Sequence, residues 1–107
     1  MKVPQSVTVG WNKYKIELVE EIEQLLEDNL QVCGECLHAE GMINLLEFQG
    51  KEFLKRTLLH EILHCVLEVY GIDLRNKNEE ATIDGLATAL MELIRNNPKL
   101  IKYLGDK

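Results

Sequence analysis

The sequence feature that most constrains the fold is a long helical pattern of apolar residues between Gly50 and Gly71. Its apolar side chains form two stripes on the same helix, Leu54, Leu58, Ile62 and Val66 on one and Leu59, Leu63, Val69 and Tyr70 on the other. A helix with two apolar stripes is covered by other elements on most of its surface. We therefore predict a central helix that ends near Gly71, a residue suited to a C-terminal stop.

The segment before this helix begins with a strand pattern. Residues 7–18 alternate between apolar and polar or small side chains on both sides of Asn12–Lys13, which predicts a β-hairpin with its turn there. From Val19 to Asp28 the period becomes helical and predicts a short amphipathic helix. The hairpin residues predicted to face the core are Val7, Val9, Trp11, Tyr14, Ile16 and Leu18.

A second strand pair and a last helix complete the predicted elements. β-Branched and aromatic residues favour strands over residues 31–39 and 42–48, which a turn at Glu40–Gly41 would join. Asn78 is a suitable N-cap for a helix that continues until the Asn-Asn-Pro interruption, and a final helical turn is expected at residues 100–104. The predicted apolar face of the last long helix comprises Ile83, Leu86, Ala87, Leu90, Met91 and Ile94.

Together these elements predict an α+β fold. We expect a single domain over residues 1–107, with a small, mainly antiparallel sheet packed on the central helix and a C-terminal helix beside it. The formal net charge of -6 disfavours binding to nucleic acid or to an anionic membrane, because both need clustered Lys and Arg. The N-terminal residues contain no apolar signal segment, and the cysteines are sparse, so we expect a cytoplasmic protein with no membrane span.

The central helix carries the sequence His60-Glu61-Ile62-Leu63-His64. Two histidines at this spacing lie on one face of a helix, with a carboxylate beside the first, and this is the geometry of a zinc site. In an apolar helix such groups are costly to bury without a partner, which argues against a chance match. A catalytic zinc takes three protein ligands and keeps one position open, so the chain must supply a third ligand elsewhere.

The first turn of the last helix offers two candidates for this third ligand. Glu80 shares a helical face with Ile83, Asp84 and Ala87, so packing of that face would direct its carboxylate inward. Glu79 neighbours Ile83 as well and stays an alternative. We prefer Glu80.

The motif and the following carboxylates resemble those of the gluzincin metallopeptidases. In that family the third zinc ligand is a Glu on a later helix, and an Asp four residues further on often supports the first histidine; Glu80 and Asp84 match this spacing, whereas Glu79 does not. The order of elements is most similar to the small ImmA/IrrE-like zincins of phages, prophages and mobile elements. This resemblance covers most of the chain, although only the HExxH segment is a specific motif. It implies a minimal zincin fold.

The motif and the resemblance predict a zinc-dependent metallopeptidase that acts on a peptide or protein, with a phage or prophage regulatory setting implied by the resemblance. His60, His64 and Glu80 would hold Zn²⁺, and Glu61 would act as general base on a zinc-bound water and return the proton to the leaving amine. Two alternatives stay open. One is a phage-encoded accessory protein that binds a partner and keeps a structural or vestigial metal site, and the other is metal-dependent hydrolysis of a non-peptide substrate.

The cysteines and several isolated residues are interpreted as structural. Cys33 and Cys36 lie near His38, but their thiols would point to opposite faces of an extended strand, and a structural zinc would need four ligands. Cys65 is expected to be buried by the central helix, so we predict buried or edge thiols. Three further residues are candidates for stabilising an oxyanion, with packing or surface exposure as the simpler interpretation of each: His38, Tyr70 and Tyr103.

Overall fold

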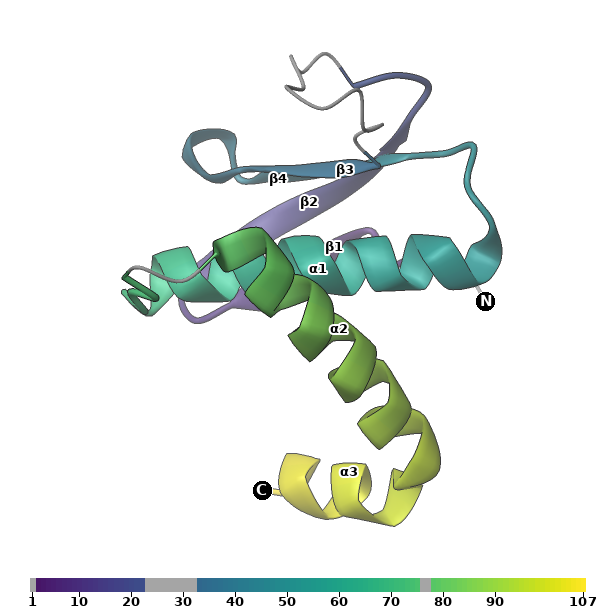
Figure 1. The fold of residues 1–107 in the computed structure, drawn as a ribbon, viewed down its shortest axis with the longest axis vertical. Coiled ribbons are helices and arrows are strands. Elements are labelled where there is room, and N and C mark those ends of the chain that lie inside the picture. The colour runs from purple at the N-terminus through teal and green to yellow at the C-terminus, as the bar shows by residue number, and fades with distance from the viewer. Residues whose placement is uncertain (1, 23–32, 76–77) are drawn as a thin grey trace.

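The computed structural model describes residues 2–22, 33–75 and 78–107. A four-stranded sheet lies against one side of a long helix, and the C-terminal helices lie on its other side (Figure 1). The predicted α+β class is confirmed. Among the described residues, no helix is both long enough and apolar enough to cross a bilayer. The elements are β1 (Ser6–Val9), β2 (Asn12–Val19), β3 (Gly34–Leu37), a 3₁₀ turn (His38–Glu40), β4 (Met42–Leu46), α1 (Lys51–Val69), α2 (Glu79–Asn96) and α3 (Pro98–Gly105).

The sheet has the strand order β1-β2-β4-β3 and is mixed but mostly antiparallel. β1 pairs with β2 and β3 with β4 in antiparallel fashion, while the central pair, β2 and β4, is parallel. The second predicted strand pair therefore forms, with Gly41 in the left-handed conformation at the turn (φ 63°). This topology leaves β3 at one edge of the sheet, on the side where α1 packs against it.

The first hairpin forms, but its turn lies two residues earlier than predicted. Val9 pairs with Asn12, so Gly10 and Trp11 make the turn instead of Asn12–Lys13. Gly10 has a positive φ of 60°, a conformation that glycine adopts at no steric cost at the first position of a type II′ turn. A Cβ built on Gly10 would also lie 2.8 Å from a methyl of Val69, so the turn packs closely on the end of α1.

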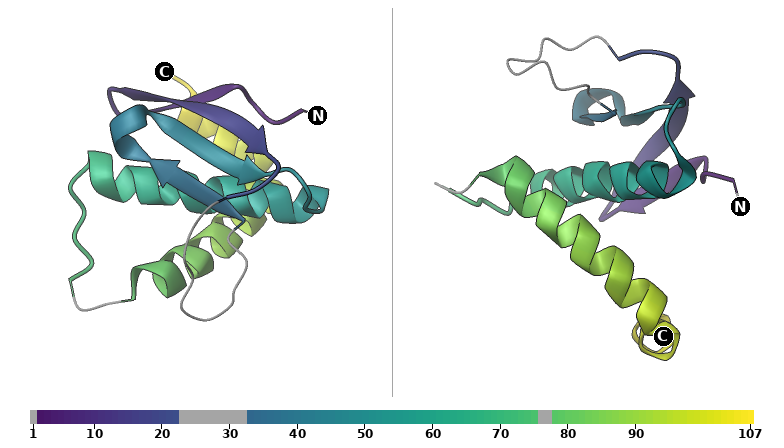
Figure 2. Two further views of the ribbon diagram at one scale, coloured as in Figure 1. Left: turned by 90° about the horizontal axis from the view of Figure 1, so that it is seen from above. Right: turned by 45° about the vertical axis from the view of Figure 1, so that its right-hand side comes forward.

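The core lies between the sheet and α1, as the views in Figure 2 show. Its most completely buried sheet residues are Tyr14, Ile43 and Leu45, and Cys65 is its fully buried residue on α1. Two predicted core residues are exposed instead. Trp11 is 78% exposed because it lies in the turn, where its ring meets Tyr70 edge-on with centroids 6.4 Å apart, and Leu18 near the end of β2 is 47% exposed.

The central helix is confirmed, including its predicted end. Gly71 has a φ of 63°, and the backbone N–H of Ile72 donates to the carbonyl of Leu67 at 2.9 Å, which is the Schellman arrangement at a helix C-terminus. The most buried line of α1 flanks the first predicted stripe on the side away from most of the second, because the buried residues of α1 are Thr57, Glu61, Cys65 and Val69. The helix predicted from Val19 to Asp28 lies mostly outside the described residues, and Val19 itself closes β2.

α2 begins as predicted, with the side chain of Asn78 accepting a hydrogen bond from the N–H of Ala81 at 3.2 Å. Its contact with α1 is less apolar than predicted. Only Ile83 and Ala87 are buried on α2, while Leu86 and Ile94 of the predicted face are 47% and 45% exposed. α2 diverges from α1 along its length and leads into α3 (Figure 1).

Polar side chains join α2 to α1 in a series of rungs, which we call the polar ladder. On α1 it uses one residue per helical turn, and its members run antiparallel along the two helices. Arg95 pairs with Glu52 at 2.7 Å, and Arg56 donates to Thr88 at 3.1 Å. The two remaining α1 positions of the ladder are His60 and His64.

Candidate metal centre

The two histidines of the HExxH motif and Glu80 bring three ligand atoms together. One turn of α1 separates His60 from His64, and their Nε2 atoms lie 3.1 Å apart. One carboxylate oxygen of Glu80 is 3.0 Å from Nε2 of His60, and the other is 2.7 Å from Nε2 of His64. The sequence preferred Glu80 over Glu79, and Glu80 is the residue that meets both of these nitrogens.

Each histidine is also held on its other ring nitrogen by a separate carboxylate from α2. Nδ1 of His60 is 2.8 Å from Asp84, and Nδ1 of His64 is 2.7 Å from Glu79. A carboxylate accepts a hydrogen bond, so a proton on each Nδ1 would satisfy Asp84 and Glu79 and leave each Nε2 free to present its lone pair. This tautomer is the one a histidine needs in order to bind a metal through Nε2.

The distances fit a small divalent cation. Ligands about 2.0–2.2 Å from a tetrahedral zinc are separated from one another by roughly 3.3 Å, so the two nitrogens and the nearest carboxylate oxygens would need to move apart by roughly 0.2–0.6 Å. Two imidazole nitrogens and a carboxylate oxygen are a typical donor set for zinc. The residues that would hold the ion are thus His60, His64 and Glu80, which form one of the candidate ligand groups among the described residues.

The site is open on one side. The side chains of His60 and His64 are 15% and 16% exposed, whereas that of Glu80 is 67% exposed. The imidazoles come from α1 and are mostly buried, and the carboxylates come from α2 and are mostly exposed. Three protein ligands would leave the fourth position of a tetrahedral zinc to water or substrate, in contrast to the four protein ligands of structural zinc sites.

Glu61 lies on the buried face of α1, between the metal centre and the sheet. It is 8% exposed, and this burial raises the pKa of its carboxyl, while the electrostatic interaction with His60 and His64 acts in the opposite direction. β3 passes directly over it, because a Cβ built on Gly34 would lie 3.1 Å from Cγ of Glu61 and 2.8 Å from the methyl of Thr57. Glu61 therefore lies at the interface between β3 and α1.

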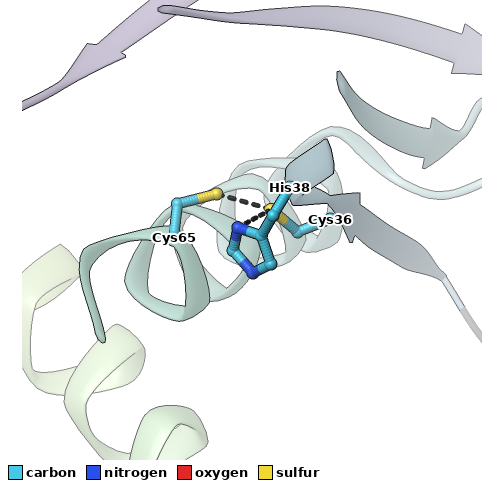
Figure 3. A group of neighbouring side chains, drawn as sticks. All are labelled: Cys36, His38 and Cys65. Atoms are coloured by element: carbon cyan, nitrogen blue, oxygen red, sulfur yellow. Dashed lines mark hydrogen bonds between the residues drawn. The ribbon is translucent and has the colours of Figure 1, made fainter. Parts of the chain in front are cut away.

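The structure brings together a second group that the sequence interpretation kept apart, namely Cys36, His38 and Cys65 (Figure 3). The sulfur atoms of Cys36 and Cys65 are 2.6 Å apart, and Nδ1 of His38 is 3.6 Å from the Cys36 sulfur. The hydrogen bond between the two thiols raises the pKa of Cys36 and lowers that of Cys65. Cys36 points from β3 toward α1, so the strand alternation that separates it from Cys33 is what directs it to Cys65.

The sequence pattern indicated the burial of Cys65 but not its contact with Cys36. Cys65 follows Glu61 by one helical turn and so shares its buried face, which was visible in the spacing. Its partner was not visible, because 29 positions separate Cys36 from Cys65 in the chain. Glu79 was considered only as a rival ligand, and its contact with the outer nitrogen of His64 was missed.

The three candidates for oxyanion stabilisation lie in different settings. His38 belongs to the 3₁₀ turn, and its Nδ1 meets the hydroxyl of Tyr14 at 3.3 Å as well as the Cys36 sulfur. Tyr70 packs on Trp11 at the far end of α1, and Tyr103 is 75% exposed on α3. The sequence candidates His38 and Tyr70 thus contact groups outside the metal centre.

Comparison of the chain with family models, with curated proteins and with solved structures found no match.

Proposed function

We propose that this protein is a metal-dependent hydrolase that cleaves peptide bonds at the centre formed by His60, His64 and Glu80. One observation carries the proposal: both Nε2 atoms converge on Glu80, while each Nδ1 is held by its own carboxylate. Histidines packed only for structural reasons have no need of this double constraint. The convergence of lone pairs toward one point is what a cation requires.

A divalent ion such as zinc, when bound there, supplies a Lewis acid that polarises a carbonyl and favours deprotonation of water. The protein's own groups would perform the proton transfers. Glu61 is the neighbouring carboxylate that is not engaged with the imidazole nitrogens, and its place beside His60 suits it to accept a proton from the attacking water. The same carboxyl would then deliver the proton to the departing amine.

Two features favour a peptide as the substrate. β3 is an edge strand of the sheet that the described residues form, and an extended peptide can add to the backbone of an edge strand as a further strand. Gly34 on this strand lies against Glu61, so a segment pairing with β3 would run next to the proposed general base.

The proposal is tested by Glu61→Gln, with Glu68→Gln as its matched control. Glu68 is an exposed residue of α1 about two turns further on, so its replacement tests the loss of one negative charge alone. The zinc-loaded proteins are incubated with a library of fluorescence-quenched peptides, and zinc content and circular dichroism are measured in parallel. We expect Glu61→Gln to lose about 10²–10⁴-fold in kcat/KM with zinc and fold retained. Equal turnover by all three proteins would refute the role of Glu61, and no turnover by the zinc-loaded wild type would refute peptide hydrolysis.

Exposed apolar side chains favour a second function, binding of a partner protein through α2 and α3. These side chains include Leu86, Leu93, Ile94, Leu100 and Ile101, each between 37% and 47% exposed. In that case the metal centre would fix α2 in place and Glu61 would have no chemical task. Unchanged cellular function in the Glu61→Gln variant supports this alternative over catalysis.

A further inference from the structure

The pair formed by Cys36 and Cys65 lies outside the proposed metal centre and joins two different layers of the fold. Cys36 comes from the edge strand β3, and Cys65 comes from the sheet-facing side of α1. Cys65 is fully buried, whereas Cys36 is partly exposed and neighbours His38 at the surface. Cys36 is thus the more accessible residue of the pair, and Figure 3 shows its sulfur between that of Cys65 and the ring of His38.

The separation of the two sulfur atoms distinguishes between a metal and a disulfide. Two thiolates on a tetrahedral zinc lie about 3.8 Å apart, because each Zn–S bond is about 2.3 Å long. A disulfide bond is about 2.05 Å long. At 2.6 Å the sulfurs would have to separate by more than an ångström to hold zinc, but would approach by only about half an ångström to bond.

We propose that Cys36 and Cys65 are a redox-active pair that closes to an intrachain disulfide between β3 and α1 when the protein meets a small-molecule disulfide. The sulfur of Cys36 attacks one sulfur of the oxidant, forming a mixed disulfide and releasing the first small thiol. The sulfur of Cys65 then attacks the Cys36 sulfur, forming the internal bond and releasing the second thiol. Two protein thiols are oxidised and one small disulfide is reduced to two thiols, so hydrogens and electrons balance.

His38 is placed to assist the first step. Its Nδ1 faces both the hydroxyl of Tyr14 and the Cys36 sulfur, and with the ring proton on Nε2 it can accept from either group. Because the hydrogen bond to Cys65 raises the pKa of the Cys36 thiol, this thiol needs a base: His38 takes its proton as the sulfur attacks and passes that proton to the departing small thiol. His38 is therefore a base for closure, and the final disulfide does not need it.

Formation of the disulfide would place a covalent link at the interface of β3 and α1, where Glu61 lies. Cys65 is next to His64, and Cys36 follows Gly34 by two positions on the strand that covers Glu61. The link joins residues 29 positions apart, so it removes freedom from the unfolded chain and fixes β3 on α1. We expect a rise in Tm of about 10 °C on oxidation.

The test uses the full chain in buffers with graded ratios of oxidised to reduced glutathione. Closure is measured by thiol titration, and the linked peptides are identified by mass spectrometry after digestion of the alkylated protein. We expect a cross-link between Cys36 and Cys65 in the wild type and in the matched control Cys33→Ser. The cross-link should be absent in Cys36→Ser, whose side chain is partly exposed, and in Cys65→Ala, which avoids burying a hydroxyl.

Three results would overturn the proposal. The first is wild-type protein that keeps both thiols, or carries only mixed disulfides, at oxidant ratios that oxidise dithiothreitol. The second is a cross-link that involves Cys33 instead. The third is a second bound zinc that Cys36→Ser removes while His60→Ala leaves it in place, because that result would make the group a metal site. His38→Gln should slow closure several-fold near neutral pH and leave the final oxidised fraction unchanged; an unchanged rate refutes the role of His38.

Discussion

Replacement of Asp84 by alanine is the sharpest test of how α2 supports the metal centre. Asp84 accepts the Nδ1 proton of His60 at 2.8 Å, and its side chain is 67% exposed. Because an exposed contact of this kind adds little to folding stability, the substitution should leave the fold intact. Its effect should appear instead in the orientation and tautomer of His60, and therefore in metal affinity.

The magnitude follows from the role of the outer hydrogen bond. Loss of such a partner typically weakens metal binding about 10–100-fold, which corresponds to roughly 1.4–2.7 kcal/mol. Glu79→Ala removes the equivalent bond to His64 at 2.7 Å and should have an effect of similar size. If each carboxylate acts only through its own histidine, the two losses multiply, and the double variant should bind zinc about 10²–10⁴-fold more weakly.

The assay is competition for zinc between each variant and a chromophoric chelator of known affinity. Glu92→Ala is the matched control, because Glu92 is another exposed carboxylate on α2. We expect the control to bind zinc within about twofold of wild type, well below the effect of losing an outer ligand. A wild-type Kd in Asp84→Ala, with unchanged circular dichroism, would show that the contact seen here does not orient a ligand and would refute the reasoning.

Three further predictions concern stability. Zinc at about 100 times its Kd should stabilise the fold by about 2.7 kcal/mol and raise Tm by about 10–20 °C over chelator-treated protein, and a Tm independent of zinc would count against the site. Gly34→Ala should cost about 1–3 kcal/mol in urea unfolding, since its new methyl would lie 2.8 Å from that of Thr57. Gly85→Ala, with open space at its Cβ, should instead add about 0.5–1 kcal/mol, so equal effects would refute the packing argument. Ile83→Ala should cost about 2–5 kcal/mol because Ile83 is 1% exposed, while Leu86→Ala at 47% exposure should cost about 0.5 kcal/mol; similar losses would show that α2 packs differently.

The parts of the fold that sequence predicted best are those with local signals. The helix with His60 and His64, its stop at Gly71 and the cap at Asn78 each depend on neighbours within one or two turns. The same holds for the Glu80 and Asp84 spacing, since both residues lie on one face of one helix. Such local patterns are set by backbone geometry and need no knowledge of the tertiary contacts.

The sequence-based predictions were wrong where the structure depends on a contact between distant residues or where two local patterns compete. Alternation in residues 7–18 is compatible with a turn at either of two places, and the positive φ available to Gly10 selects the earlier one. The apolar face predicted for α2 assumed that the whole helix packs on α1, but its divergence leaves Leu86 and Ile94 exposed. The approach of Cys36 to Cys65 depends on how β3 lies across α1, which no local pattern encodes.

The polar ladder makes metal affinity a property that ionic strength can tune. Glu80 reaches the histidines only while α2 lies beside α1, and the ladder includes an exposed ion pair between Arg95 and Glu52. Dissolved salt screens exposed charges over about 10 Å at 0.1 M, so it weakens this ion pair, whose side chains are 47% and 65% exposed. A change in salt concentration can thus alter how readily the centre fills without touching any of its ligands.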